Sequence, residues 1–151
     1  MIKAHRIGVC VLALAAAAQV QAGGPAGTVK TVSGQVIVER DKQKFPATVG
    51  APIEVSDTLR TGPDGAVGVT LHDSTLLSAG PRSTMVIDKF IYDSKTNEGR
   101  ISVGVRKGTL AVATGKIAKR SPESVDFHTP TSTLGVRGTE FVIDVGAGSD
   151  E

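Results

Sequence analysis

The sequence predicts an all-β domain built as an irregular β-helix, a solenoid-like stack of short strands, with a β-sandwich as the alternative. Apolar residues recur at every second position after several glycines. Gly65, for example, is followed by Val67, Val69 and Leu71, which places these side chains on one face of an extended strand. Turn-forming groups such as TGPDG at 61–65 separate the runs. Glycines interrupt every candidate helix, so we expect none.

The first half of the mature chain supplies six expected strands, each bounded by a turn. Gly34 starts an alternation through Val36 and Val38, and an Asp73-Ser74 turn separates the last two strands of this half. The six strands cover residues 28–32, 34–39, 57–61, 65–71, 74–78 and 83–91.

The second half supplies five more strands. Gly99 is followed by Ile101, Val103 and Val105, and a Ser-Pro pair at 121–122 marks a turn. These strands cover residues 99–106, 108–114, 124–128, 131–136 and 139–145. The glycine-led units begin at irregular intervals, which argues against a regular β-helix and permits an irregular one.

The N-terminus has the pattern of a secretory signal peptide over residues 1–22. A basic start containing Lys3 and Arg6 precedes an apolar run of twelve residues, which is too short for a bilayer span of about 20 residues. Val20 and Ala22 occupy the −3 and −1 positions of the expected cleavage site. We therefore expect a periplasmic or secreted protein with no transmembrane span after cleavage.

The domain organisation follows from this cleavage. We expect a flexible leader at 23–27, one β domain at 28–145 and a C-terminal tail at 146–151. The mature chain has 129 residues, 15 basic against 15 acidic, and no cysteine. A neutral chain lacks the basic surface that nucleic-acid binding requires, so we expect no nucleic-acid partner. Without disulfides, packing and strand pairing must stabilise the fold.

Reactive side chains are few, and their spacing argues against an enzyme. His72, Asp73 and Ser74 are consecutive, and neighbouring strand residues point to opposite faces, so they cannot converge as a catalytic triad does. His128 precedes a Thr-Pro pair and reads as a residue at a strand end. No cysteine, histidine pair or acidic loop has the spacing of a metal site. We expect no catalytic residue, no metal and no cofactor.

The densest motif is TPTSTLGVRGTEF at residues 129–141. We expect Gly135 to allow close backbone approach and Gly138 to form a bulge or adopt positive φ. Such a bulge would bring Arg137 and Glu140 to one side, where Arg137 acts as a structural clamp rather than a ligand anchor. The motif residues that we assign this structural role are Thr129, Pro130, Gly135, Arg137, Gly138, Thr139, Glu140 and Phe141.

This motif closely resembles the signature of the FecR-like domain family. Weaker likeness extends over the earlier half of the chain, at DTLRTG (57–62), GAVGVTL (65–71), DSTL (73–76), Ile87 and GTL (108–110). The resemblance implies an all-β, β-helix-like periplasmic domain without enzymatic activity. Domains of this family usually continue with at least one more glycine-led strand after the motif, so we expect either that the chain is truncated or that its last strand has an open edge.

The best-known members of the family combine a cytosolic anti-sigma region, one membrane span and this periplasmic domain, which relays a signal from a TonB-dependent receptor. The present chain shows a signal peptide in place of that arrangement. We therefore expect a protein-interaction or scaffold module that binds an envelope protein, or itself, through an open strand edge. A soluble component of envelope signalling related to sigma-factor regulation and TonB-dependent iron uptake is one alternative. A cell-wall or polysaccharide-binding module is the other.

Overall fold

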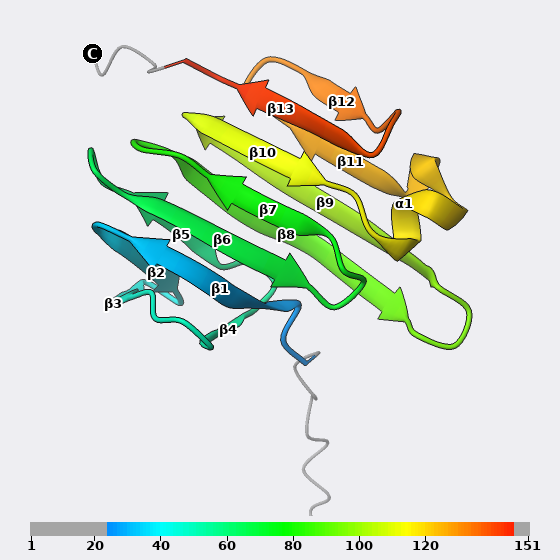
Figure 1. The fold of residues 1–151 in the computed structure, drawn as a ribbon, viewed down its shortest axis with the longest axis horizontal. Helices are drawn as coiled ribbons and strands as arrows, with labels where there is room; N and C mark the ends of the chain where they lie inside the picture. Colours follow the sequence, from blue (N-terminus) through cyan, green and yellow to red (C-terminus); the bar gives the residue numbers. More distant parts are fainter. Residues whose placement is uncertain (1–23, 147–151) are drawn as a thin grey trace, which may run out of the picture.

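Two β-sheets stacked face to face make up the fold in the computed structural model, which describes residues 24–146 (Figure 1). Sheet A has the strand order β13-β10-β7-β6-β1-β4 and sheet B the order β12-β11-β9-β8-β5-β2-β3. The strands of sheet A are β1 (Gly27–Ser33), β4 (Pro52–Ile53), β6 (Ala66–Leu71), β7 (Leu76–Ala79), β10 (Thr109–Ala113) and β13 (Glu140–Asp144). Those of sheet B are β2 (Val36–Arg40), β3 (Gln43–Pro46), β5 (Thr58–Thr61), β8 (Thr84–Asp93), β9 (Glu98–Lys107), β11 (Val125–His128) and β12 (Thr133–Gly135).

The chain begins with β1 and β2, and β4 and β3 then pair with them to form one end of the two sheets. From β5 onward the chain advances toward the opposite end, passing between the layers, and finishes with β12 in sheet B and β13 in sheet A (Figure 1). From β7 onward each new strand pairs with the preceding strand of its own sheet. The C-terminal end of the sandwich is built entirely from residues after 108.

The expected β-helix is not what the structure shows. Within residues 24–146, ten of the eleven paired strand ladders are antiparallel, and the pairing of β9 with β11 is parallel. Solenoid rungs would stack in parallel, whereas short turns join neighbours such as β6 and β7 into hairpins. The two sheets fit the alternative that the sequence left open, a β-sandwich.

The period-two pattern does locate the core. Val67, Val69 and Leu71 of β6 are buried between the sheets, and so are Val103 of β9 and Leu110 of β10. Each of the eleven expected strands is present within a few residues of its expected bounds. Alternation identified the apolar face of strands such as β6 and β10, because one side of each meets the opposite sheet.

Two edge strands and two short helices were not expected. β3 follows a tight turn in which Asp41 and Lys42 both have positive φ, without the glycine that usually marks such a turn. Helix α1 (Lys116–Arg120) and the 3₁₀ turn η1 (Pro122–Ser124) are too short to show a helical apolar period. The expectation that the chain contains no helix is therefore wrong, because α1 and η1 are present.

The N-terminal boundary lies earlier than expected. β1 begins at Gly27, inside the expected leader, and Ala26 is buried, with its amide donating to the Ile53 carbonyl at 2.7 Å. Hydrogen bonding to sheet A thus holds the last residues of the expected leader, Ala26 and Gly27, in place. The expected signal peptide at 1–22 and residues 147–151 of the expected tail lie outside the described residues.

A buried ion pair closes the end of the sandwich near β2. The Asp57 side chain is 0% exposed and accepts from Arg40 Nε at 2.7 Å, Arg40 Nη2 at 2.6 Å and the Glu54 amide at 2.8 Å. The hydrogen bond to Asp57 raises the pKa of Arg40 above its ordinary value. Arg40 also stacks over Phe45, 5.4 Å from the ring centre. Asp57, which immediately precedes β5, thereby joins the start of β5 to the β2–β3 hairpin.

A second buried carboxylate, that of Asp73, explains why α1 forms. The Asp73 carbonyl accepts from the Lys116 amide at 2.8 Å, and its Oδ2 accepts from the Ile117 amide at 3.3 Å. The same carboxylate holds the amide and hydroxyl of Thr75. The backbone amides at the start of α1, which have no partner within the helix, thus donate hydrogen bonds to a turn some 40 residues earlier in the chain.

Candidate functional site

The motif at residues 129–141 forms the C-terminal end of the sandwich, where the chain passes from sheet B to sheet A. Thr129 opens a turn that contains Pro130: its amide donates to the Ser132 carbonyl at 2.8 Å, and its hydroxyl accepts from the Ser132 amide at 3.1 Å. β12 then runs along the edge of sheet B, and β13, which contains Glu140 and Phe141, runs along the edge of sheet A. The expected motif residues therefore form two edge strands and the turns that bound them.

Gly138 makes the crossing between the sheets. Its φ is 110°, a left-handed conformation that side chains other than glycine rarely adopt, which confirms the expectation of positive φ. The next residue, Thr139, is fixed to β10, because its carbonyl accepts from the Thr114 amide at 2.8 Å. Gly135 behaves differently from expectation. A Cβ placed there meets no atom within 4 Å, so no close backbone approach requires this glycine.

Arg137 and Glu140 do not form the expected clamp. Both residues are exposed, and among the ion pairs and hydrogen bonds of residues 24–146 none joins these two side chains. The residue between the two glycines that packs into the core is instead Val136, which is 5% exposed. The motif is thus anchored through Val136 and the inward side chains of β13, while its charged groups remain on the surface.

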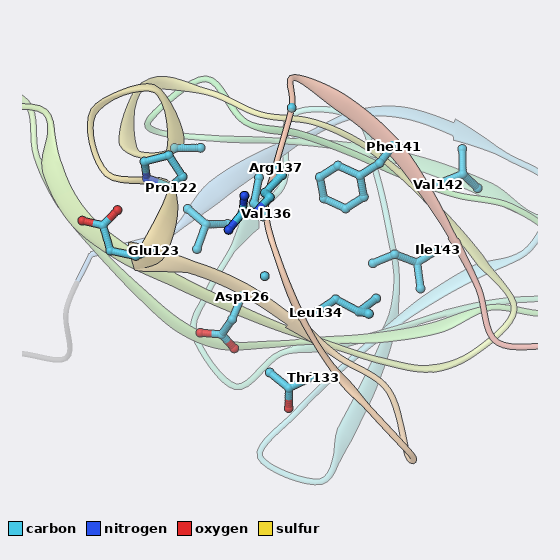
Figure 2. Close-up of a pocket in the computed structure, with 14 residues that line it drawn as sticks. Pro122, Glu123, Asp126, Thr133, Leu134, Val136, Arg137, Phe141, Val142 and Ile143 are labelled. Atoms are coloured by element: carbon cyan, nitrogen blue, oxygen red, sulfur yellow. The ribbon is translucent and has the colours of Figure 1, made fainter.

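A groove of about 920 Å³ lies between the two layers at this end (Figure 2). Apolar side chains from β12, β13 and the segment between them surround it, and Figure 2 shows Leu134, Phe141 and Ile143 around the space. Glu123 and Asp126 lie on the opposite wall, which β11 and the 3₁₀ turn η1 provide. Phe141 in turn packs against the buried ring of Phe127 on β11, with ring centres 5.3 Å apart in an edge-to-face arrangement.

The two ends of the sandwich differ in how their edge strands are protected. At the β3 and β4 end, Lys44, Pro46 and Pro52 occupy the edge strands, and β4 has only two residues. Lysine, proline and short length are devices that discourage another strand from pairing with an edge. Pairing of a further strand is therefore disfavoured at this end of the molecule.

The C-terminal edges carry few such devices. Leu134 of β12 is 39% exposed and Val142 of β13 is 65% exposed. Neither strand contains proline or lysine. Within the described residues, no strand pairs with the outer side of β12 or of β13. An exposed apolar edge beside an apolar groove is suited to binding a further polypeptide segment.

A polar cluster lies on the outer face of sheet B, around His128 at the end of β11. Its Nε2 is 2.8 Å from Asp88 Oδ2 on β8, and its Nδ1 is 3.7 Å from Asp126 Oδ2. The imidazole crosses over Gly104 of β9, where a Cβ would lie only 2.9 Å from Nε2. Ser102 donates its hydroxyl to Asp126 at 2.8 Å. The serine is thus bonded to a carboxylate and not to the imidazole that would activate a nucleophile.

The consecutive residues His72 and Asp73 point in opposite directions, as the strand geometry predicted. His72 is exposed and Asp73 is fully buried. The His72 ring lies beside Phe90, and Phe90 lies beside Tyr92, with ring centres 6.4 Å apart in both pairs. These three rings line an open cleft of about 650 Å³ near the start of β1.

Within residues 24–146, no group of three or more histidine, cysteine, aspartate or glutamate side chains is arranged to hold a metal ion. The same range contains no helix with the length and apolar character needed to cross a bilayer.

The sequence pattern identified the motif but not the groove around it. The wall formed by Glu123 and Asp126, and the pairing of His128 with Asp88, depend on the parallel register of β9 and β11. No local pattern encodes that register, because the paired residues lie at least 24 positions apart. The one available signal was alternation in β13, which places Phe141 and Ile143 on the inner side.

The family model described as FecR protein matches residues 57–151, which include β5 to β13 and the whole of the groove. Neither the curated proteins nor the solved structures give a significant match.

Proposed function

The chain belongs to the FecR protein family, and from this premise we propose that it is a non-catalytic binding module that holds a protein partner at the C-terminal end of the sandwich. The family suggests a signalling-related domain of the cell envelope. The observation that carries the proposal is the contrast between the two ends: the edges at β3 and β4 are protected, whereas those at β12 and β13 flank an apolar groove.

The non-catalytic part of the proposal rests on how the potentially reactive side chains are used. Ser102 donates to Asp126, His128 lies against Asp88, and Asp73 is committed to the start of α1. Ser102 and His128 thus join strands, and Asp73 joins a turn to the start of a helix. A periplasmic or secreted location rests on the signal-peptide pattern of residues 1–22 and on the envelope association of the family.

Site-specific photo-crosslinking tests this proposal. A photoreactive amino acid is placed at Val142, which is 65% exposed on the edge of β13, and, as a matched control, at Val49, which is 67% exposed in the loop between β3 and β4. The full chain is expressed in a bacterium with its signal peptide, and envelope fractions are irradiated. We expect discrete adducts from position 142 and none from position 49. Equal labelling from both positions, or none from position 142, would contradict the proposal.

A second candidate function, glycan binding, is favoured by the aromatic cleft. His72, Phe90 and Tyr92 expose ring surfaces on which sugar rings could stack, and the Tyr92 hydroxyl bonds to Asn97 at 2.9 Å. Co-sedimentation with purified peptidoglycan tests this candidate. Binding that Tyr92→Ala weakens and that Val55→Ala, a surface change elsewhere, leaves intact would support it. Equal sedimentation of both variants with the parent chain would eliminate the cleft as the site.

A further inference from the structure

The geometry of β13 points to a specific partner: an extended segment with a basic residue, three apolar residues and a second basic residue, added antiparallel to the outer edge of this strand. This inference rests on the proposed function, since it assumes that the C-terminal end binds protein. It goes further by assigning which strand is extended and what chemistry the partner carries.

The backbone of β13 presents a regular row of free groups. The Thr139 carbonyl accepts from the Thr114 amide at 2.8 Å, and the Val145 amide donates to the Gly108 carbonyl at 2.9 Å, so odd-numbered residues direct their amides and carbonyls toward β10. Direction alternates along a strand. Glu140, Val142 and Asp144 therefore direct theirs away from sheet A, where no strand of the described residues pairs with them.

The side chains of these three residues define what lies opposite on the outer face. Glu140, Val142 and Asp144 are all exposed, and in residues 24–146 neither acidic side chain forms an ion pair. Directly opposed residues of antiparallel strands have adjacent side chains, and opposite charges in such pairs stabilise. A partner would therefore place basic residues against Glu140 and Asp144 and an apolar residue against Val142.

The two intervening partner residues face inward. Phe141 and Ile143 alternate with the exposed residues and point between the sheets, where the groove of about 920 Å³ begins (Figure 2). Side chains of an added strand at these positions would extend the inner layer over Leu134 and Val136. They would be apolar, because the groove is lined mainly by apolar residues on this side.

A second copy of the chain is a poorer occupant of the same edge. Antiparallel pairing of two β13 strands about Val142 gives the longest overlap, and it places Glu140 of each copy opposite Asp144 of the other. Both flanking pairs would then bring two carboxylates together, which destabilises a ladder. Charge thus selects a basic partner over self-association.

Two synthetic peptides test the inference against the full chain purified after secretion. One has the sequence SGKVVVKGS and the other SGEVVVEGS, each with a fluorophore at its N-terminus, and affinity is measured by fluorescence anisotropy. We expect the lysine peptide to bind roughly tenfold more tightly than the glutamate peptide. The charge-reversed variant Glu140→Lys/Asp144→Lys should invert this preference. Equal binding of both peptides, or an unchanged preference in the reversed variant, would overturn the inference.

A backbone variant separates strand addition from general stickiness. Val142→Pro removes an amide that faces away from β10, and proline is tolerated on an edge strand when its missing N–H faces solvent. Val142→Thr keeps the amide and the branched shape. We expect loss of peptide binding in Val142→Pro alone, with circular dichroism unchanged in both variants. Equal affinity in the two would exclude strand addition at β13.

The photo-crosslinks distinguish the failure of this inference from failure of the proposed function. Adducts at position 142 combined with no charge preference would leave the binding module in place and remove the basic partner. Absence of both adducts and peptide binding would remove both.

Discussion

Replacing Arg40 by alanine should destabilise the protein by about 3 kcal/mol, because it leaves the carboxylate of Asp57 buried without its counter-charge. Asp57 is 0% exposed and accepts three hydrogen bonds, of which Arg40 donates two, at 2.6 and 2.7 Å. Removal of one partner from a buried pair costs about 3–5 kcal/mol. The Arg40 side chain is 25% exposed, so water can reach part of the vacated space, and we take the lower end of that range.

Urea denaturation followed by circular dichroism measures this loss, and Arg60→Ala is the matched control. Arg60 pairs with Glu39 at 3.4 Å between the same two strands, but its side chain is 49% exposed. Exposed pairs contribute about 0–1 kcal/mol. For a domain of this size, a loss of about 3 kcal/mol should lower the Tm by roughly 10 °C, whereas the control should lower it by at most a few degrees.

Adding Asp57→Asn to Arg40→Ala identifies the source of the cost. The neutral amide removes the buried charge while it keeps the shape, so the double variant should be more stable than Arg40→Ala alone. Hydrogen bonding to Asp57 raises the pKa of Arg40, so the guanidinium stays charged in the folded and unfolded states at neutral pH, and its contribution to stability should not change between about pH 6 and 9. Equal stability of Arg40→Ala and Arg60→Ala, or further loss in the double variant, would refute this account.

Three further predictions concern the motif and α1, each measured by urea denaturation. Gly135→Ala should change stability by less than about 0.5 kcal/mol because its Cβ meets no atom within 4 Å, whereas Gly138→Ala should cost about 1–2 kcal/mol because its φ is 110°; equal costs would contradict the geometry. Arg137→Ala should change stability by less than about 0.5 kcal/mol because the side chain is exposed. A larger loss of stability would support the structural clamp that the sequence predicted for Arg137. Asp73→Ala should cost about 2–3 kcal/mol and speed hydrogen exchange at the start of α1, because a buried carboxylate there accepts three hydrogen bonds; Asp93→Ala, which loses an exposed turn contact, is the control and should change stability little.

Local alternation was enough to predict eleven of the thirteen strands in residues 24–146 and the inner face of strands such as β6. Val67, Val69 and Leu71 are buried because one face of β6 meets the other sheet. The need for an apolar face appears in the sequence as apolar residues at every second position. The positive φ of Gly138 was also predictable, because glycine adopts this conformation without the steric cost that a Cβ imposes.

Long-range pairing decided what the sequence could not predict. A β-helix and a sandwich use the same strands and differ in whether neighbouring strands run parallel, and the alternation of a single strand carries no information about its neighbour's direction. Helix α1 depends on hydrogen bonds to Asp73, which lies more than 40 residues earlier in the sequence. The clamp assigned to Arg137 assumed one strand with a bulge at Gly138, whereas β12 and β13, the strands before and after this glycine, belong to different sheets.

The course of the chain from β7 onward has a consequence for growth of the domain. Since each of these strands is added beside the preceding strand of its own sheet, lengthening the sandwich requires only that another extended segment pair with β13 or β12, and no strand near β2 and β5 has to move. A strand from a different polypeptide would meet the same backbone groups as one from the same polypeptide. A further strand of the same polypeptide and a strand of a partner would therefore compete for the same row of backbone amides and carbonyls. Binding of either one would exclude the other.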